Sequence, residues 1–147
     1  MIKDFVMAWN KNKKKLEEYF RTHKQGEYCD YEDLVKLLFD IIINPERSNG
    51  LRAYDTDNIL VIDDGDWQGT QIFVLHENRY QPNVEEYVYT NTYYGSCSGC
   101  DTLQAISGYS ESLPTEQQVK DYMTLCMHLM QKCVFMIDVE EEGEYEK

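Results

Sequence analysis

Apolar residues recur at intervals of three and four near both ends of the chain, the spacing of helices with one buried face. The first such stretch predicts a helix over residues 2–22. A second helix begins after Asp30, a favourable N-cap, and is expected to stop at Asn44 and Pro45. A third long helix follows Thr115 and Gln118, which fit a capping box, and continues to Cys133.

The middle of the chain has the short apolar runs and alternating pattern of strands. Residues 59–62 and 71–76 predict two strands joined by a short acidic turn, hence an antiparallel hairpin. Residues 84–94 predict a third strand and residues 134–139 a fourth. In the third strand, alternation places Tyr87, Tyr89 and Tyr93 on one face. The opposite face receives Val88, Thr90, Thr92 and Tyr94.

A short helix is expected between the third strand and the last long helix. Ser98 is its predicted N-cap, Asp101 its N3 residue and Gly108 its end. Together these elements predict an α+β fold, an antiparallel sheet of about four strands packed against several helices. Residues 1–147 are expected to form a single domain, with a disordered acidic tail at 140–147.

Charge is distributed unevenly along the chain. The net charge is −13, yet residues 1–27 carry seven Lys or Arg against four Asp or Glu. The remaining 120 residues carry seven against 23. Such a field repels nucleic acid and anionic membranes and attracts basic protein surfaces. It also serves solubility, and the sequence leaves both roles open.

Candidate partner-binding residues lie in the acidic hairpin and on the tyrosine-rich strand. An acidic ladder of this kind could imitate the phosphate array of DNA. Asp63, Asp64 and Asp66 could also bind Mg²⁺ or Ca²⁺, although a turn is the simpler interpretation. The complete candidate set is Asp63, Asp64, Asp66, Trp67, Glu85, Glu86, Tyr87, Tyr89 and Tyr93.

Cys97 and Cys100 are two thiols three positions apart, between Gly95 and the predicted short helix. This spacing is half of a zinc site, but Cys126, His128 and Cys133 are poorly placed to complete it. A redox pair is a second possibility, and packing beneath a tight turn is the simplest one. We therefore expect no resident cofactor, with zinc at Cys97 and Cys100 as the alternative.

No nucleophile motif or phosphate-binding loop is present, and the three histidines are scattered. The sequence thus favours a binding protein over an enzyme. Residues 1–5 lack the apolar core of a signal peptide, and the apolar runs are too short to span a bilayer. With five cysteines, an odd number, these features lead us to expect a cytoplasmic protein.

Three segments resemble small uncharacterised proteins of tailed phages and prophages. They are the DDGDWQGT stretch from Asp63, the YGSCSGCDTL stretch from Tyr94, and residues 113–123, within a region of similarity over about residues 59–131. The resemblance implies a host-directed accessory protein acting in the cytoplasm of the host cell. We therefore expect an inhibitor of a basic host protein, such as a defence nuclease targeted by an anti-CRISPR-like DNA mimic. The alternatives are a zinc or thiol module at Cys97 and Cys100, and a nucleotide-sized ligand binder lined by the tyrosines and Trp67.

Overall fold

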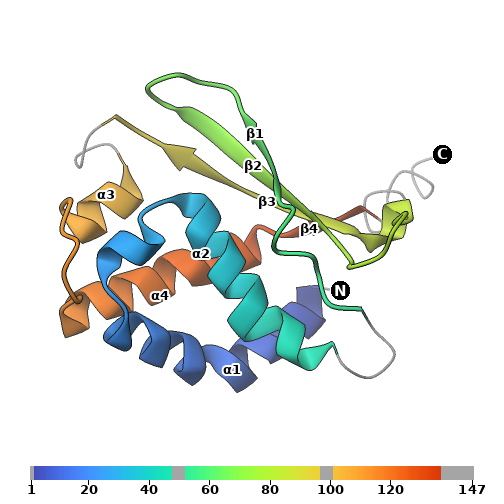
Figure 1. Ribbon diagram of the computed structural model, residues 1–147, viewed down its shortest axis with the longest axis horizontal. Helices are drawn as coiled ribbons and strands as arrows, with labels where there is room; N and C mark the ends of the chain where they lie inside the picture. The colour runs from blue at the N-terminus through green and yellow to red at the C-terminus, as the bar shows by residue number, and fades with distance from the viewer. Residues whose placement is uncertain (1, 48–51, 97–100, 137–147) are drawn as a thin grey trace.

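The computed structural model describes residues 2–47, 52–96 and 101–136 (Figure 1). Eight helical segments lie in the described residues, most of them in the first third of the chain. They are α1 (Ile2–Thr22), η1 (Gln25–Tyr28), α2 (Tyr31–Leu37), η2 (Leu38–Ile43), η3 (Asn44–Glu46), η4 (Val84–Glu86), α3 (Thr102–Ser107) and α4 (Glu116–Gln131). None of the helices in these ranges has the length and apolarity required to cross a bilayer.

The second helix does not stop at Asn44 and Pro45 as expected. After α2 the chain widens into the π-helical turn η2 and then tightens into the 3₁₀ turn η3, which contains Pro45. A proline in the first turn of such a segment loses no hydrogen bond, since its nitrogen has no partner there. The Asn44 side chain then pairs with both backbone groups of Tyr54, at 2.8 and 3.1 Å, and anchors the following loop.

The four strands are β1 (Leu60–Asp63), β2 (Gly69–His76), β3 (Tyr87–Tyr94) and β4 (Val134–Phe135). They form one antiparallel sheet in the order β1-β2-β3-β4, which confirms the predicted α+β fold. Residues 84–86, expected as the start of the third strand, instead form η4, because the Glu86 amide bonds back to the Asn83 carbonyl. Residues 137–139 of the predicted last strand and the tail 140–147 lie outside the described residues.

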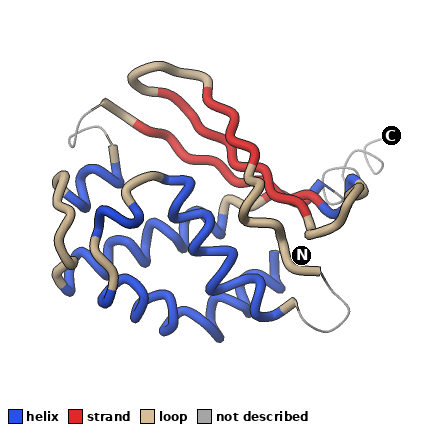
Figure 2. Tube along the Cα trace, in the orientation of Figure 1, coloured by secondary structure: helices blue, strands red, loops and turns tan. Residues whose placement is uncertain are grey.

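All of the long helices cover one face of the sheet (Figures 1 and 2). Phe73, Leu75 and Val88 point to this inner face and are completely buried. Thr90, also buried there, donates its hydroxyl hydrogen to the Leu129 carbonyl of α4, at 2.7 Å. Phe5 of α1 packs against Phe135 of β4, with ring centroids 4.8 Å apart. The burial of every second residue from Val88 to Thr92 confirms the alternation predicted for the third strand.

Two of the helix ends predicted for α3 and α4 are confirmed, and one differs. Thr115 and Gln118 form the expected capping box, and Gly108 ends α3 in the left-handed region at φ 57°. The start of α3 differs from the prediction, because Asp101 is the N-cap and accepts a hydrogen bond from the Gln104 amide at 3.1 Å. Ser98, the expected cap, lies outside the described residues.

Candidate functional site

The outer face of the sheet is turned away from the helices (Figure 1), and the strand register aligns two mainly apolar rows of residues across it. The first row is Leu60, Val74, Tyr89 and Val134, paired in register across all four strands. The second is Ile62 and Ile72, followed by Asn91 on β3. None of these seven side chains belongs to the buried core, and we call them the outer rows. Leu60 is 58% exposed and Ile62 48% exposed.

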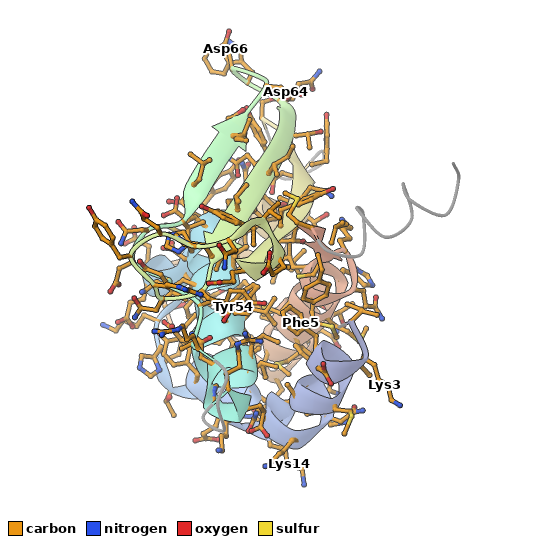
Figure 3. The ribbon with its side chains drawn as sticks, turned by 90° about the vertical axis from the view of Figure 1, so that its right-hand side faces the viewer. Lys3, Phe5, Lys14, Tyr54, Asp64 and Asp66 are labelled. Carbon is orange, nitrogen blue, oxygen red and sulfur yellow. The ribbon has the colours of Figure 1, made fainter. Side chains whose placement is uncertain are left out.

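The hairpin between β1 and β2 projects beyond the helices and ends in a tip rich in carboxylates (Figure 3). Trp67 is 80% exposed at this tip, and the Asp66 carboxylate next to it is exposed too. A tryptophan with this exposure gains nothing from the core, so its apolar surface is available to another molecule. The tip thus presents one large aromatic side chain beside a negative charge.

Asp63 and Asp64 shape the tip from within. The Asp64 carboxylate accepts from the Thr70 amide at 2.7 Å, and Asp63 accepts from the Gly65 amide and the Tyr94 hydroxyl. The Tyr94 hydroxyl, followed by the Gly65 amide, holds the pKa of Asp63 below its usual range, and Asp63 raises the pKa of Tyr94 to about 12. The Asp63 carboxylate thus keeps its charge at neutral pH while it holds the turn in shape.

The tip also requires glycine at two positions. A Cβ atom on Gly65 would lie 1.9 Å from the Gln68 carbonyl oxygen, and one on Gly69 would lie 2.5 Å from an Asp64 carboxylate oxygen. Both distances are far below van der Waals contact, so the strands approach each other in a way that a side chain would prevent. The tip is consequently a shaped element, fixed by both backbone and side-chain contacts.

The remaining predicted partner-binding residues fall into two groups. Tyr87 and Tyr93 share the outer face with Tyr89, and Tyr93 is 53% exposed. Glu85 is exposed beside the start of β3. Glu86 is only 7% exposed, because its carboxylate accepts from Arg79 at 2.6 Å and from Asn83 at 3.0 Å. Glu86 therefore stabilises the loop before β3 and is not presented to a partner.

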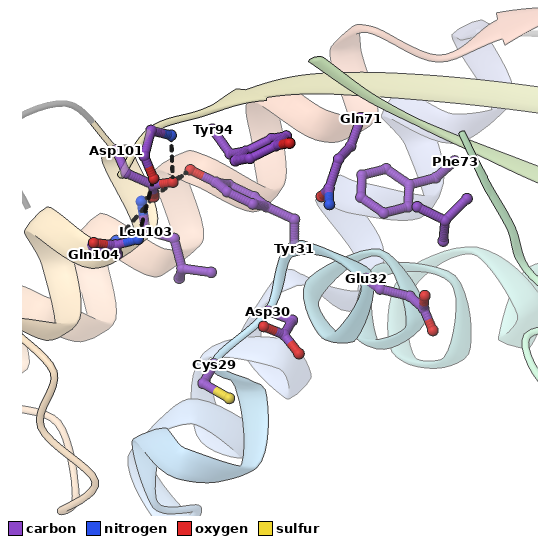
Figure 4. A pocket seen from close by; sticks show the side chains of 12 residues that line it. Cys29, Asp30, Tyr31, Glu32, Gln71, Phe73, Tyr94, Asp101, Leu103 and Gln104 are labelled. Carbon is purple, nitrogen blue, oxygen red and sulfur yellow. Dashed lines mark hydrogen bonds between the residues drawn. The ribbon is translucent and has the colours of Figure 1, made fainter. Parts of the chain in front are cut away.

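Beneath the tip half of the sheet lies a cleft of about 330 Å³ (Figure 4). It opens between the inner face of the hairpin, the start of α2 and the start of α3, and we call it the inner cleft. Aromatic side chains and carboxylates are its main features. Its lining includes Tyr31, Phe73, Tyr94, Asp30, Glu32 and Asp101. The sequence pattern did not indicate this cleft, since its residues come from four separate segments.

Asp101 joins three of these segments. Its carboxylate accepts from the Tyr31 hydroxyl at 2.9 Å, the Gly95 amide at 2.8 Å and the Gln104 amide at 3.1 Å. The Tyr31 hydroxyl in turn accepts from the Leu103 amide at 3.1 Å. Asp101 is 6% exposed, and none of its partners in the described part of the chain is a cation. A buried carboxylate is tolerated here because neutral donors replace the water that it has lost.

Three possible metal ligands meet at the edge of the inner cleft: Cys29, Asp30 and Asp33, whose ligand atoms lie within 4.8 Å of one another. The Asp33 carboxylate, however, accepts from the Asp30 amide at 3.2 Å, so the start of α2 accounts for this proximity. Desolvation, then Asp30 and Asp33, raise the pKa of the Cys29 thiol. A protonated thiol is a poor metal ligand, and the group gives little support to a metal site.

The other proposed chemistry is not brought together in the described residues. Cys97 and Cys100, the predicted zinc ligands, lie outside them. Cys126 and Cys133 are buried in the core, where burial raises the pKa of both thiols. Asp63, Asp64 and Asp66 do not converge into a metal-binding group in the part of the chain that the structure describes.

The fold and these surfaces define a small α+β protein with an open sheet face. Comparisons with family models, with curated proteins and with solved structures found no match to this chain.

Proposed function

We propose that this protein is a non-enzymatic binding module whose outer rows and hairpin tip are covered by a partner protein with a basic surface. The observation that carries the proposal is the open sheet face, where apolar residues are aligned across all four strands and no described helix or strand covers them. Contiguous apolar patches of this kind mark interaction sites in soluble proteins.

The composition of the face agrees with a protein partner. Tyrosine and tryptophan are enriched at protein interfaces, because they combine a large apolar area with few rotatable bonds. Tyr89 lies in the first outer row, Tyr93 lies toward the tip, and Trp67 stands at the tip itself. These three residues are the expected anchors. Leu60 and Ile62 add exposed apolar surface on β1.

Charge specifies the kind of partner. Asp66 lies beside Trp67 at one end of the face and Glu85 lies near its other end, and neither forms an ion pair among the described residues. A basic partner surface would meet both carboxylates and would be attracted over a distance by the net charge of −13. The resemblance to phage proteins suggests a host nuclease, whose nucleic-acid site is such a surface.

The proposal is tested with purified defence nucleases by biolayer interferometry and by nuclease assays. Replacing both Leu60 and Ile62 with serine should weaken binding and inhibition at least tenfold, because two aligned apolar side chains are lost from the interface. Leu113→Ser is the matched control, since Leu113 is 53% exposed in the loop before α4, away from the sheet. It should leave binding unchanged.

Three outcomes would overturn the proposal. One is equal binding by the Leu60 and Ile62 double variant and by the Leu113→Ser variant. A second is binding that does not weaken between 50 and 500 mM salt, because contacts between exposed charges are screened in that range. The third is a stable homodimer in light scattering that the double variant dissociates, which would assign the outer rows to a second copy of this chain.

A further inference from the structure

The inner cleft lies on the opposite side of the sheet from the outer rows, so the proposed partner surface does not account for it. A second cavity of about 410 Å³ lies next to it and shares Cys29, Leu103 and Gln104 with its lining. A cavity of about 330 Å³ has room for roughly ten water molecules, or for one side chain of the size of arginine.

Three aromatic rings lie in its lining, and the ring of Tyr94 has the most open surface. Phe73 and Tyr31 are almost completely buried, at 0% and 5% exposure, and Tyr94 is partly exposed at the end of β3. The hydroxyls of both tyrosines are held by hydrogen bonds, to Asp101 and to Asp63 respectively. The ring positions are therefore fixed by one contact within the lining, to Asp101, and one at the hairpin tip, to Asp63, so the cleft is preformed.

The charge of the lining is of one sign. Asp30, Glu32 and Asp101 line the inner cleft, Glu111 lines the second cavity, and no Lys, Arg or His of residues 2–47, 52–96 and 101–136 lines either one. Asp30, Glu32 and Glu111 form no ion pair among the described residues, and Asp101 is 94% buried with only neutral donors around it. The raised pKa of the Cys29 thiol, to which Asp30, Asp33 and Glu111 all contribute after desolvation, reflects the same negative potential.

We propose that the inner cleft is a binding site for an organic cation, specifically the guanidinium group of an arginine side chain. Aromatic faces attract cations, and a guanidinium is planar, weakly hydrated and able to stack on a ring while donating to carboxylates. A metal ion fits less well, because the walls offer rings and the nearest carboxylates already serve as the cap of α2. The site requires no partner at the outer rows.

The direct test uses N-acetyl-arginine amide as the probe, with the citrulline analogue as its neutral isostere. Titration followed by the NMR signals of the aromatic rings should give saturable shifts for the arginine probe and a dissociation constant at least tenfold weaker for citrulline. Glu32→Gln and Glu111→Gln should each weaken arginine binding about two- to fivefold, the range of exposed ion pairs. Glu85→Gln is the matched control, since Glu85 is exposed at the far end of the sheet.

A second measurement does not depend on the probe. Cys29 is exposed at the junction of the two cavities, so its alkylation can be followed by peptide mass spectrometry. A methanethiosulfonate with a trimethylammonium group should modify Cys29 about tenfold faster than one with a sulfonate group at low salt, since opposite charges are attracted. The Glu32→Gln and Glu111→Gln double variant should reduce this preference.

Equal affinity for the arginine and citrulline probes would overturn the assignment, as would equal rates for the two reagents. So would full arginine binding by the double variant in a protein whose circular dichroism is unchanged. The serine variants at Leu60 and Ile62 should bind the arginine probe normally, because they lie on the other face. If these serine variants lose nuclease binding and keep arginine binding, both proposals are supported. The nuclease assay therefore tests the outer rows, and the arginine titration tests the inner cleft.

Discussion

Removal of the Asp101 carboxylate should destabilise the protein more than most other single surface or loop changes, because one side chain supports three segments. It caps α3 through the Gln104 amide, fixes the end of β3 through the Gly95 amide, and holds Tyr31 at the start of α2. In Asp101→Ala all three donors lose their acceptor inside a site that is 6% exposed.

The magnitude follows from these contacts. Loss of an N-cap costs about 1 kcal/mol, and each of the two other stranded donors costs about 1–2 kcal/mol. Asp101→Ala should therefore lower the free energy of unfolding by about 3–5 kcal/mol. In Asp101→Asn one oxygen can still accept from Tyr31 and Gln104, but the new amide group faces the Gly95 amide, a second donor. That variant should cost about 1–3 kcal/mol.

Urea denaturation followed by circular dichroism measures both values. Asp66→Asn is the control, since Asp66 is exposed at the hairpin tip and its substitution should change stability by less than about 0.5 kcal/mol. The reasoning is wrong if Asp101→Ala costs less than about 1 kcal/mol. It is also wrong if Tyr31→Phe and Asp101→Ala have additive effects, because residues that share a hydrogen bond must be coupled.

Two further predictions concern the hairpin tip. Tyr94→Phe removes the hydrogen bond that contributes most to the lowered pKa of Asp63. An NMR titration of the variant should show that pKa rising toward its usual value, and an unchanged pKa would contradict the hydrogen bond. In the wild type, the Asp63 carboxylate adds to the free energy of unfolding at neutral pH, and this stabilisation is lost as the pH falls through its lowered pKa. Gly65→Ala should cost about 1–3 kcal/mol in thermal or urea unfolding, because the new Cβ would meet the Gln68 carbonyl at 1.9 Å. Gly26→Ala, with its nearest atom at 3.5 Å, is the control, and equal costs for the two would refute the argument.

The elements that the sequence predicted well are those governed by local chemistry. Helical periodicity identified α1 and α4, the capping box identified the start of α4, and alternation assigned the inner and outer faces of β3. Each of these signals depends on residues within a few positions of one another. The antiparallel pairing of β1 with β2 followed from the short connection between them.

The features that the sequence missed depend on distant partners. Asp101 was assigned to the first turn of a helix. It is the N-cap instead, and its carboxylate also accepts a hydrogen bond from Tyr31, 70 residues earlier in the chain. Glu86 was assigned to the surface, yet Arg79 and Asn83 fold back over its carboxylate. Likewise, the alignment of Leu60 with Val74 and Tyr89 requires the strand register, which a pattern along one strand does not contain.

The open outer face and the inner cleft have a common origin in the length of the hairpin. Along the inner face of β2, the buried Leu75 and Phe73 are followed toward the tip by the partly exposed Gln71, whose amide donates to Asp63. The apolar side chains therefore end before the strand does, and the last part of the hairpin extends past the helices without a core beneath it (Figures 1 and 4). If the hairpin served only to cover the core, its strands could end at Phe73. The polar Gln71 on the inner face and the shaped tip would then have no role in folding. Since folding alone does not require this extension, exposed side chains such as Trp67 at the tip, Leu60 in the outer rows and Glu32 at the cleft are where substitutions should change binding with little effect on stability.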